Sequence, residues 1–291
     1  MAGYGIMKKK KFSIGTCIIY IVLSIWALTT IYPIFWVIEN SFKAKDKILA
    51  NSFALPFGDL FTTGNYRKAF DSLNIFGAYK NSICISVTVA VVVVLLAGLA
   101  AFALVRYDFK IKGFLNSMVI AGMMFPVFAT IIPVYHMESS WGITNTSSWG
   151  LSMLSVILPQ IAGNLSFAIV VLSGYIKGLP IELEEAAFLE GCNSFQIFGK
   201  VIMPLAKPSF ATVMIFSFLW SYNDLFTQMF FLRRPEMRAI TVLLNNLTSQ
   251  EGTNYGLMAA AVTLVVVPVI IVYIFLQKYI IKGMTAGAVK G

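Results

Sequence analysis

Residues 81–105 read NSICISVTVAVVVVLLAGLAAFALV and contain no charged side chain. A helix rises about 1.5 Å per residue, and roughly 20 residues are needed to cross the hydrocarbon region of a bilayer. The run is therefore long enough to span a membrane as a single helix. It predicts an integral membrane protein.

Five further runs are uncharged or nearly so. They lie between Lys11 and Glu39, Lys112 and Glu138, Glu138 and Lys177, Lys207 and about Phe231, and Glu251 and Lys278. Asp224 is the one charge inside them, in the run that ends near Phe231. The sequence thus predicts an all-α, polytopic membrane protein with six transmembrane helices and with both termini on the same side.

The composition agrees with this class. Of the 291 residues, 58% are hydrophobic and 12% are charged, whereas a soluble domain has about 45–50% apolar and about 25% charged residues. The net charge of +9 is spread over small basic groups between the apolar runs. This distribution favours membrane topology over nucleic-acid binding and disfavours a soluble enzyme.

Basic residues in the loops set the orientation. Placing the N-terminus in the cytoplasm puts Lys8–Lys11 and the dense group Arg106, Lys110 and Lys112 inside, as the positive-inside rule prefers. The uncharged run Phe12–Val37 is too long for a signal peptide, so we expect a retained helix. We expect an N-terminal helix and extracytoplasmic loop over 1–76, a five-helix core over 77–281 and a cytoplasmic tail over 282–291.

One predicted cytoplasmic segment, Lys177 to Pro208, has the sequence features of two short helices. Pro180 suits the first turn of a helix, and Gly191 suits the left-handed position that ends it. Asn193 followed by Gln196 predicts a capping box for a second helix, which should stop before Pro204. The result is a helix–glycine–helix elbow.

Apolar side chains of this elbow, such as Phe188, Leu189 and Phe195, would be exposed to water unless another surface covers them. Two alternatives explain them. The elbow is either an amphipathic segment that packs on its own membrane domain or a docking knob for a cytosolic partner. Physical chemistry alone favours neither.

The spacing within the elbow resembles a known motif. Glu185-Ala186-Ala187, Gly191 and then Val201-Ile202-Met203-Pro204 resemble the EAA loop of bacterial ABC importer permeases, with Val201 and Met203 departing conservatively from the usual Ile and Leu. Other stretches resemble the MalG-like carbohydrate permeases, which are binding-protein-dependent inner-membrane components. These stretches are residues 102–109, residues 215–226 with Tyr222 where Trp is usual, and residues 277–291.

The resemblance implies an ABC importer type I permease fold in the bacterial cell membrane and the import of a sugar or oligosaccharide. It also implies four kinds of partner besides the bilayer: a MalF-like second permease, two cytosolic ATPase subunits, an extracytoplasmic solute-binding protein and the sugar. The family coupling residues fall on Glu185, Ala186, Ala187, Gly191 and Pro204 within the loop 178–208. The tail around Thr285–Lys290 is also expected to reach the ATPase dimer.

The chain itself is expected to be a permease subunit, with no catalytic, cofactor-binding or metal-binding residues. It contains no G-x-x-x-x-G-K-[ST] stretch, so ATP and Mg²⁺ should bind to the partner ATPase subunits. Three cysteines without a C-x-x-C spacing and a single histidine disfavour a metal site.

A sugar path needs polar and aromatic groups within the membrane. The predicted fifth helix offers Trp220, Ser221, Tyr222, Asn223 and Asp224. Further candidates are Asn164 and Ser166, Phe125, Phe128 and Tyr135, and the prolines Pro126, Pro133, Pro159 and Pro268 as kink sites. Ordinary packing is the alternative for each aromatic residue, and a helix-end charge near the outer interface is the alternative for Asp224.

A second functional class is a secondary transporter or channel subunit for a small polar solute. Ion-coupled carriers usually need buried ionisable residues, and Asp224 alone meets that requirement here. The sequence therefore favours the ABC permease.

Overall fold

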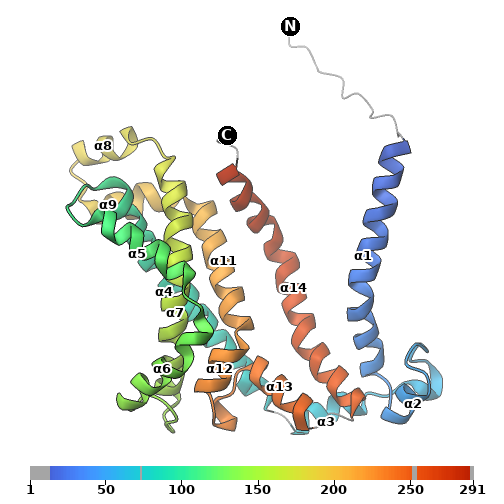
Figure 1. Ribbon diagram of the computed structural model, residues 1–291. Coiled ribbons are helices and arrows are strands. Elements are labelled where there is room, and N and C mark those ends of the chain that lie inside the picture. Colours follow the sequence, from blue (N-terminus) through green and yellow to red (C-terminus); the bar gives the residue numbers. More distant parts are fainter. Residues whose placement is uncertain (1–13, 73, 251–253, 289–291) are drawn as a thin grey trace. The chain divides into compact units, whose positions relative to one another are not determined.

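The computed structural model describes residues 14–72, 74–250 and 254–288, and these residues form helices and loops without any strand (Figure 1). The predicted basic cluster Lys8–Lys11 and the last three residues of the predicted tail lie outside the described part. The helical fold class is confirmed.

The chain divides into two compact units. Unit 1 holds residues 1–69 and 251–264, and unit 2 holds residues 70–250 and 265–291. Unit 1 contains α1 (Ile14–Ser41), α2 (Lys45–Ala50), most of α3 (Gly64–Ser72) and the start of α14 (Tyr255–Ala288). Unit 2 contains α4 (Ile75–Arg106), α5 (Lys112–Met124), α6 (Val127–Ser140), α7 (Trp149–Lys177), α8 (Glu182–Leu189), α9 (Ser194–Ile197), α10 (Met203–Leu205), α11 (Lys207–Asn223), α12 (Leu225–Phe231), α13 (Ile240–Gln250) and the rest of α14.

Four described helices are long and apolar enough to cross a membrane: α1, α4, α7 and residues 255–275 of α14. Two bent pairs raise the number to six if each pair forms one span. The pairs are α5 with α6, bent by 102°, and residues 194–205 with α11, bent by 85°.

The third predicted span, Lys112 to Glu138, is broken rather than continuous. Proline disfavours the helical conformation at the residue before it, and Phe125 accordingly has an extended backbone with φ −74° and ψ 122°. The fifth predicted span is interrupted as well. There α11 ends at Asn223, and the Asp224 carboxylate caps α12 by accepting a hydrogen bond from the Thr227 N–H at 3.1 Å.

The core of unit 2 lies where α4 packs against α7 and α11. Ile85, Val89, Val93, Ala97 and Ala101 recur every four residues along α4, so they form one stripe, and all five are fully buried. Small side chains, such as those of Ala97 and Ala101, let helices approach closely in a membrane, where apolar burial alone gives little driving force. Figure 1 shows α8 and α9 at one end of this unit and α6 and α12 at the other.

Unit 1 is built differently. The apolar window of α1 has no buried residue, and burial in this helix begins only at Glu39, Asn40 and Ser41. The start of α14 packs tightly on this end of unit 1. A Cβ atom on Gly256 would lie 2.8 Å from the Lys43 carbonyl oxygen, so only glycine fits there without a shift.

Candidate functional site

The elbow predicted between Lys177 and Pro208 is present. Its first arm, α8, ends in a Schellman motif, in which the Gly191 N–H bonds to the Phe188 carbonyl at 2.9 Å and the Cys192 N–H bonds to the Ala187 carbonyl at 3.0 Å. Gly191 has φ +87°, a conformation that L side chains rarely adopt. The predicted left-handed glycine at the end of this helix is confirmed.

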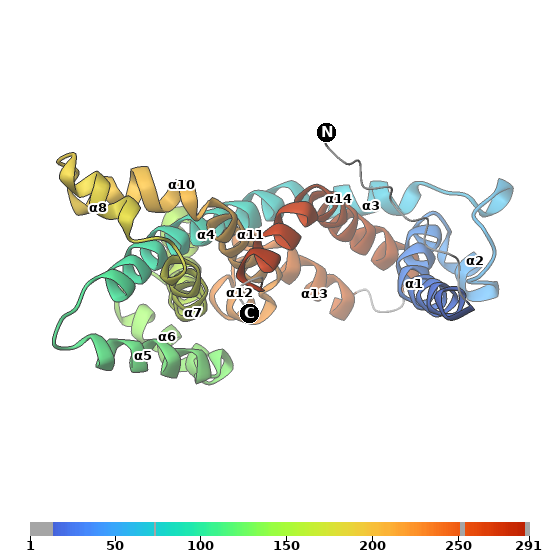
Figure 2. The ribbon, with the colours of Figure 1, turned by 90° about the horizontal axis from the view of Figure 1, so that it is seen from above.

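The second arm begins with the predicted capping box. The Asn193 side chain accepts the Gln196 N–H at 3.0 Å, and the Gln196 side chain accepts the Asn193 N–H at 2.9 Å. Figure 2 shows the elbow from above, with α8 and α10 at one end of unit 2.

The prediction that this arm stops before Pro204 is wrong, because it continues to Leu205. A π-helical turn over Phe198–Ile202 shifts the hydrogen-bond pattern, and the Met203 N–H bonds to the Phe198 carbonyl five residues back. Pro204 then lies in the first turn of α10, where its missing N–H needs no partner.

Arg106, the last residue of α4, anchors the elbow. Its Nε donates to Glu184 Oε1 at 2.7 Å, and its second guanidinium nitrogen donates to the Leu179 carbonyl at 2.9 Å. Both charged side chains are about nine-tenths buried, with exposed fractions of 11% and 10%. Next to this pair, the Tyr107 and Ser194 hydroxyl groups bond at 2.8 Å. These contacts fix both arms of the elbow to the end of α4.

Three large apolar side chains of the elbow are exposed. Phe188, Leu189 and Phe195 have exposed fractions of 70%, 87% and 76%, and we call these three residues the elbow tip. Among the predicted coupling residues, Glu185, Ala186, Gly191 and Pro204 are exposed, whereas Ala187 is half-buried against the core. The elbow thus exposes an apolar tip, while contacts to Arg106 and Tyr107 hold its two arms in place.

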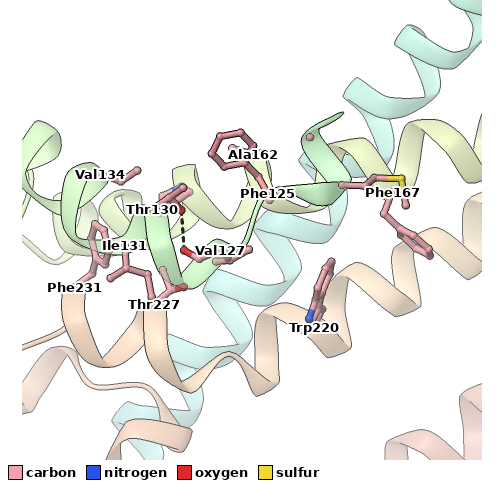
Figure 3. Close-up of a pocket in the computed structure, with 14 residues that line it drawn as sticks. Phe125, Val127, Thr130, Ile131, Val134, Ala162, Phe167, Trp220, Thr227 and Phe231 are labelled. Carbon is pink, nitrogen blue, oxygen red and sulfur yellow. Dashed lines mark hydrogen bonds between the residues drawn. The ribbon is translucent and has the colours of Figure 1, made fainter. Parts of the chain in front are cut away.

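Two adjoining cavities of about 470 and 500 Å³ lie at the break between α5 and α6, and Figure 3 shows the residues that line the first of them. They share the lining residues Val127, Ile131, Pro159, Gly163, Trp220 and Thr227. Side chains from the α5–α6 junction, α7, α11 and α12 surround this space. Both helix breaks border the same region, because Pro126 and Asp224 line the second cavity.

A polar network runs beside this second cavity. Gln160 of α7 connects two predicted path residues: its side-chain oxygen accepts the Ser221 hydroxyl at 2.5 Å, and its nitrogen donates to the Asp224 carboxylate at 2.9 Å. Gln228 donates to the Ser221 carbonyl at 2.7 Å and accepts the Thr241 hydroxyl at 2.7 Å. The network ties α7 to α11, α12 and α13.

The predicted path residues divide into two groups. Trp220, Asn223 and Asp224 line the cavities, as do Phe125, Phe128 and Asn164. Ser221 is buried in the Gln160 network.

Tyr222, in contrast, is buried with its ring stacked on Phe218 at 5.8 Å and does not line either cavity. The Tyr135 ring lies 4.6 Å from the Arg233 guanidinium carbon and 5.5 Å from the Phe231 ring, and it lines neither cavity.

Two residues of the site were not predicted. Arg106 and Gln160 lie far in sequence from the groups that they join, so no local spacing marks them. A signal did exist for each: a basic residue closing a long apolar run, and an amide within membrane depth four residues before Asn164. No group of three metal-ligating side chains occurs among the described residues.

Two known proteins are similar to this chain over most of its length. The chain is 30% identical to the arabinooligosaccharides transport system permease protein AraQ of Halalkalibacterium halodurans, over 98% of this chain and 100% of the relative. It is 30% identical to the diacetylchitobiose uptake system permease protein NgcG of Streptomyces coelicolor, over 91% of this chain and 86% of the relative.

A solved structure shares the fold. One chain of a bacterial ABC transporter involved in the import of the acidic polysaccharide alginate matches with a TM-score of 0.78 and 24% identity, covering 92% of this chain and 98% of that chain. The family pattern of the binding-protein-dependent transport system inner membrane component matches residues 93–286, well over half of the chain. The chain therefore belongs to the family of binding-protein-dependent transport system inner membrane components.

Proposed function

We propose that this chain is the permease subunit of an ABC importer that moves a sugar or oligosaccharide into the cell. The elbow couples it to a separate ATPase through Glu185, Ala186, Ala187, Gly191 and Pro204. The observation that carries the coupling role is the exposed elbow tip held by the buried Arg106–Glu184 pair. An apolar tip of this kind favours a protein partner over water.

The substrate class rests on the relatives and on the chemistry of the cavities. AraQ and NgcG are named for the uptake of arabinooligosaccharides and diacetylchitobiose. The cavities offer the exposed indole of Trp220 for stacking, and amide and carboxylate groups on Asn164, Asn223 and Asp224 for hydroxyl hydrogen bonds. Their volumes fall in the range of about 300–1,000 Å³ that is usual for small-molecule sites.

The proposed assembly contains a MalF-like second permease, two cytosolic ATPase subunits that bind ATP and Mg²⁺, and an extracytoplasmic solute-binding protein. Both termini of this chain are cytoplasmic in the proposed topology. The division into an N-terminal segment 1–76, a core 77–281 with the coupling loop 178–208, and a tail 282–291 is part of the same proposal.

The test is radiolabelled sugar uptake by the assembled transporter in proteoliposomes, with arabinooligosaccharides and diacetylchitobiose among the sugars. Trp220→Ala should raise the half-saturating sugar concentration about fivefold, the equivalent of the ~1 kcal/mol expected for one aromatic contact. Trp26→Ala is the matched control, because Trp26 is an exposed indole of α1 and does not line the cavities. Equal effects of the two changes would contradict the path, and ATP-independent uptake would support the secondary transporter instead.

A further inference from the structure

In unit 1, residues 51–57 form a segment in which alternate side chains are exposed. Phe53, Leu55 and Phe57 have exposed fractions of 70%, 47% and 74%, whereas the residues between them, Ala54 and Pro56, are half-buried. We call Phe53, Leu55 and Phe57 the apolar ridge. Within residues 51–57 the large apolar side chains are exposed and the smaller Ala54 and Pro56 are half-buried. A loop that faces water shows the reverse pattern.

A buried lysine holds the ridge in this arrangement. Lys43 is fully buried, and its ammonium group donates to the Ser52 carbonyl at 2.9 Å and to the Ala54 carbonyl at 2.6 Å. Glu39 lies 3.5 Å away. A buried ammonium needs such partners to offset the loss of water. Because the two carbonyl groups flank Phe53, the lysine fixes the backbone on both sides of this ridge residue.

The ridge is also fixed to the end of a membrane-spanning helix. The Asn40 side chain, in the last turn of α1, donates to the Ser52 carbonyl at 3.1 Å. The Thr62 N–H donates to the Phe42 carbonyl at 2.7 Å, which ties the far side of the loop to the residue after α1. The apolar run of α1 is long enough to span a bilayer, so the end of this helix is expected at the membrane surface. The ridge therefore lies at the level where the apolar run ends.

Four basic and three acidic groups are exposed between the end of α1 and the end of α3. On α2, Lys45 and Lys47 are exposed with Asp46 between them, and Arg67, Lys68 and Asp71 on α3 are exposed too. Asp59 is the third exposed acid. The two lysines of α2 lie closest in sequence to the end of α1, and basic groups at a membrane surface bind phosphate groups.

We propose that the apolar ridge inserts into the headgroup layer of the bilayer, and that Lys45 and Lys47 bind the phosphates of anionic phospholipid. The ridge is thus a lipid-binding segment at the end of α1, and Lys43 is the residue that positions it. This proposal rests on the membrane-spanning character of α1 and is independent of the transported substrate.

Photo-crosslinking of the assembled transporter tests it, in nanodiscs of phosphatidylcholine and phosphatidylglycerol with the solute-binding protein present. Benzoylphenylalanine replaces Phe53, or Thr63 as the matched control, an exposed polar residue of the same loop outside the ridge. Mass spectrometry should find lipid adducts at position 53 in several-fold excess over position 63. Adducts with the solute-binding protein alone, or equal lipid adducts at both positions, would overturn the proposal.

Two further variants separate the role of the two lysine charges from the role of the ridge conformation. In the Lys45→Gln/Lys47→Gln variant, the preference of the position-53 adducts for phosphatidylglycerol should fall by about fivefold for each lysine lost. Lys43→Met, in a chain that still inserts and assembles, should reduce lipid adducts at position 53 and leave position 63 unchanged. An unaltered headgroup preference in the first variant would overturn the anionic-lipid site.

Discussion

Basic residues at the ends of two helices hold exposed apolar side chains in place, one in each unit. Arg106 ends α4 and supports the elbow tip through a carboxylate at 2.7 Å and a carbonyl at 2.9 Å. Lys43 follows α1 by two residues and supports the apolar ridge through two carbonyls, with a carboxylate at 3.5 Å. Each buried cation replaces its hydration by contacts to the segment that it orients.

The two regions differ in how far these contacts reach along the chain. Arg106 joins groups 73 and 78 residues away, whereas Lys43 joins carbonyls 9 and 11 residues away. The planar guanidinium binds two groups in fixed directions, and an ammonium acts more as a point charge. Arg106 joins separate helices, so its contacts can transmit a displacement of one helix to another. Lys43 joins groups within one loop, so its contacts set the conformation of that loop. We therefore expect changes in the elbow to affect coupling and changes in the ridge to affect membrane contact.

The largest expected difference comes from placing proline in each region. Gly191→Pro conflicts with φ +87°, removes the N–H that bonds to Phe188, and follows Glu190, whose ψ of 3° proline disfavours. We expect a distortion of about 3 kcal/mol, a chain that still inserts, and ATP hydrolysis without sugar uptake. Uptake and ATP hydrolysis measured on the same proteoliposomes check this.

Gly58→Pro is the control for that experiment. Gly58 also has a positive φ, +58°, and at both glycines an added Cβ atom would meet no other atom within 4 Å, so the two substitutions carry the same kind of backbone conflict. It also follows Phe57, whose extended backbone suits proline. Uptake per ATP hydrolysed should stay near the wild-type ratio. Wild-type uptake by Gly191→Pro would show that the elbow does not couple transport.

A comparable loss of stability is expected from breaking the long-range anchor. Arg106→Met leaves the buried Glu184 carboxylate unpaired, which should destabilise the chain by about 3 kcal/mol. Arg106→Met/Glu184→Met should recover most of that loss, because the unpaired charge is gone. Thermal unfolding of the purified transporter in detergent measures both. A double variant as unstable as the single one would mean that the carbonyl contact to Leu179, rather than the ion pair, holds the elbow.

The smallest effect on stability is expected at the tips themselves. Leu189→Ser should change stability by less than about 0.5 kcal/mol, because Leu189 is almost fully exposed, yet it should reduce co-purification of the ATPase. Leu49→Ser, at an exposed leucine of α2, should leave co-purification unchanged. Undiminished ATPase binding by Leu189→Ser would remove the elbow tip from the interface.

Local features of the elbow were predictable because their signals are short-range. Gly191 and the pair Asn193 and Gln196 mark a helix end and a helix start through hydrogen bonds within a few residues. The extension past Pro204 was not predicted, because a π-helical turn depends on how the whole arm packs. The resemblance to ABC importer permeases is confirmed by the family match.

Features that depend on packing between distant segments escaped prediction. The sequence suggested a kink at Pro126, but not a bend of 102° that opens a cavity. It placed Tyr222 beside Asn223 in one path cluster, although neighbours on a helix point in different directions, and only Asn223 lines a cavity. Gln160 joins Ser221 and Asp224 from 61 and 64 residues away, a relation that no single stretch of sequence records.

The tight contact at Gly256 has a consequence for the order of assembly during synthesis. Unit 1 combines residues 1–69 with residues 251–264, so its final contact forms only after nearly the whole chain has left the ribosome. Until then α1 and its loop lack their C-terminal complement, while most of unit 2 is already synthesised. A substitution at Gly256 would thus act late, by preventing the start of α14 from packing on Lys43 and Asn65 within unit 1.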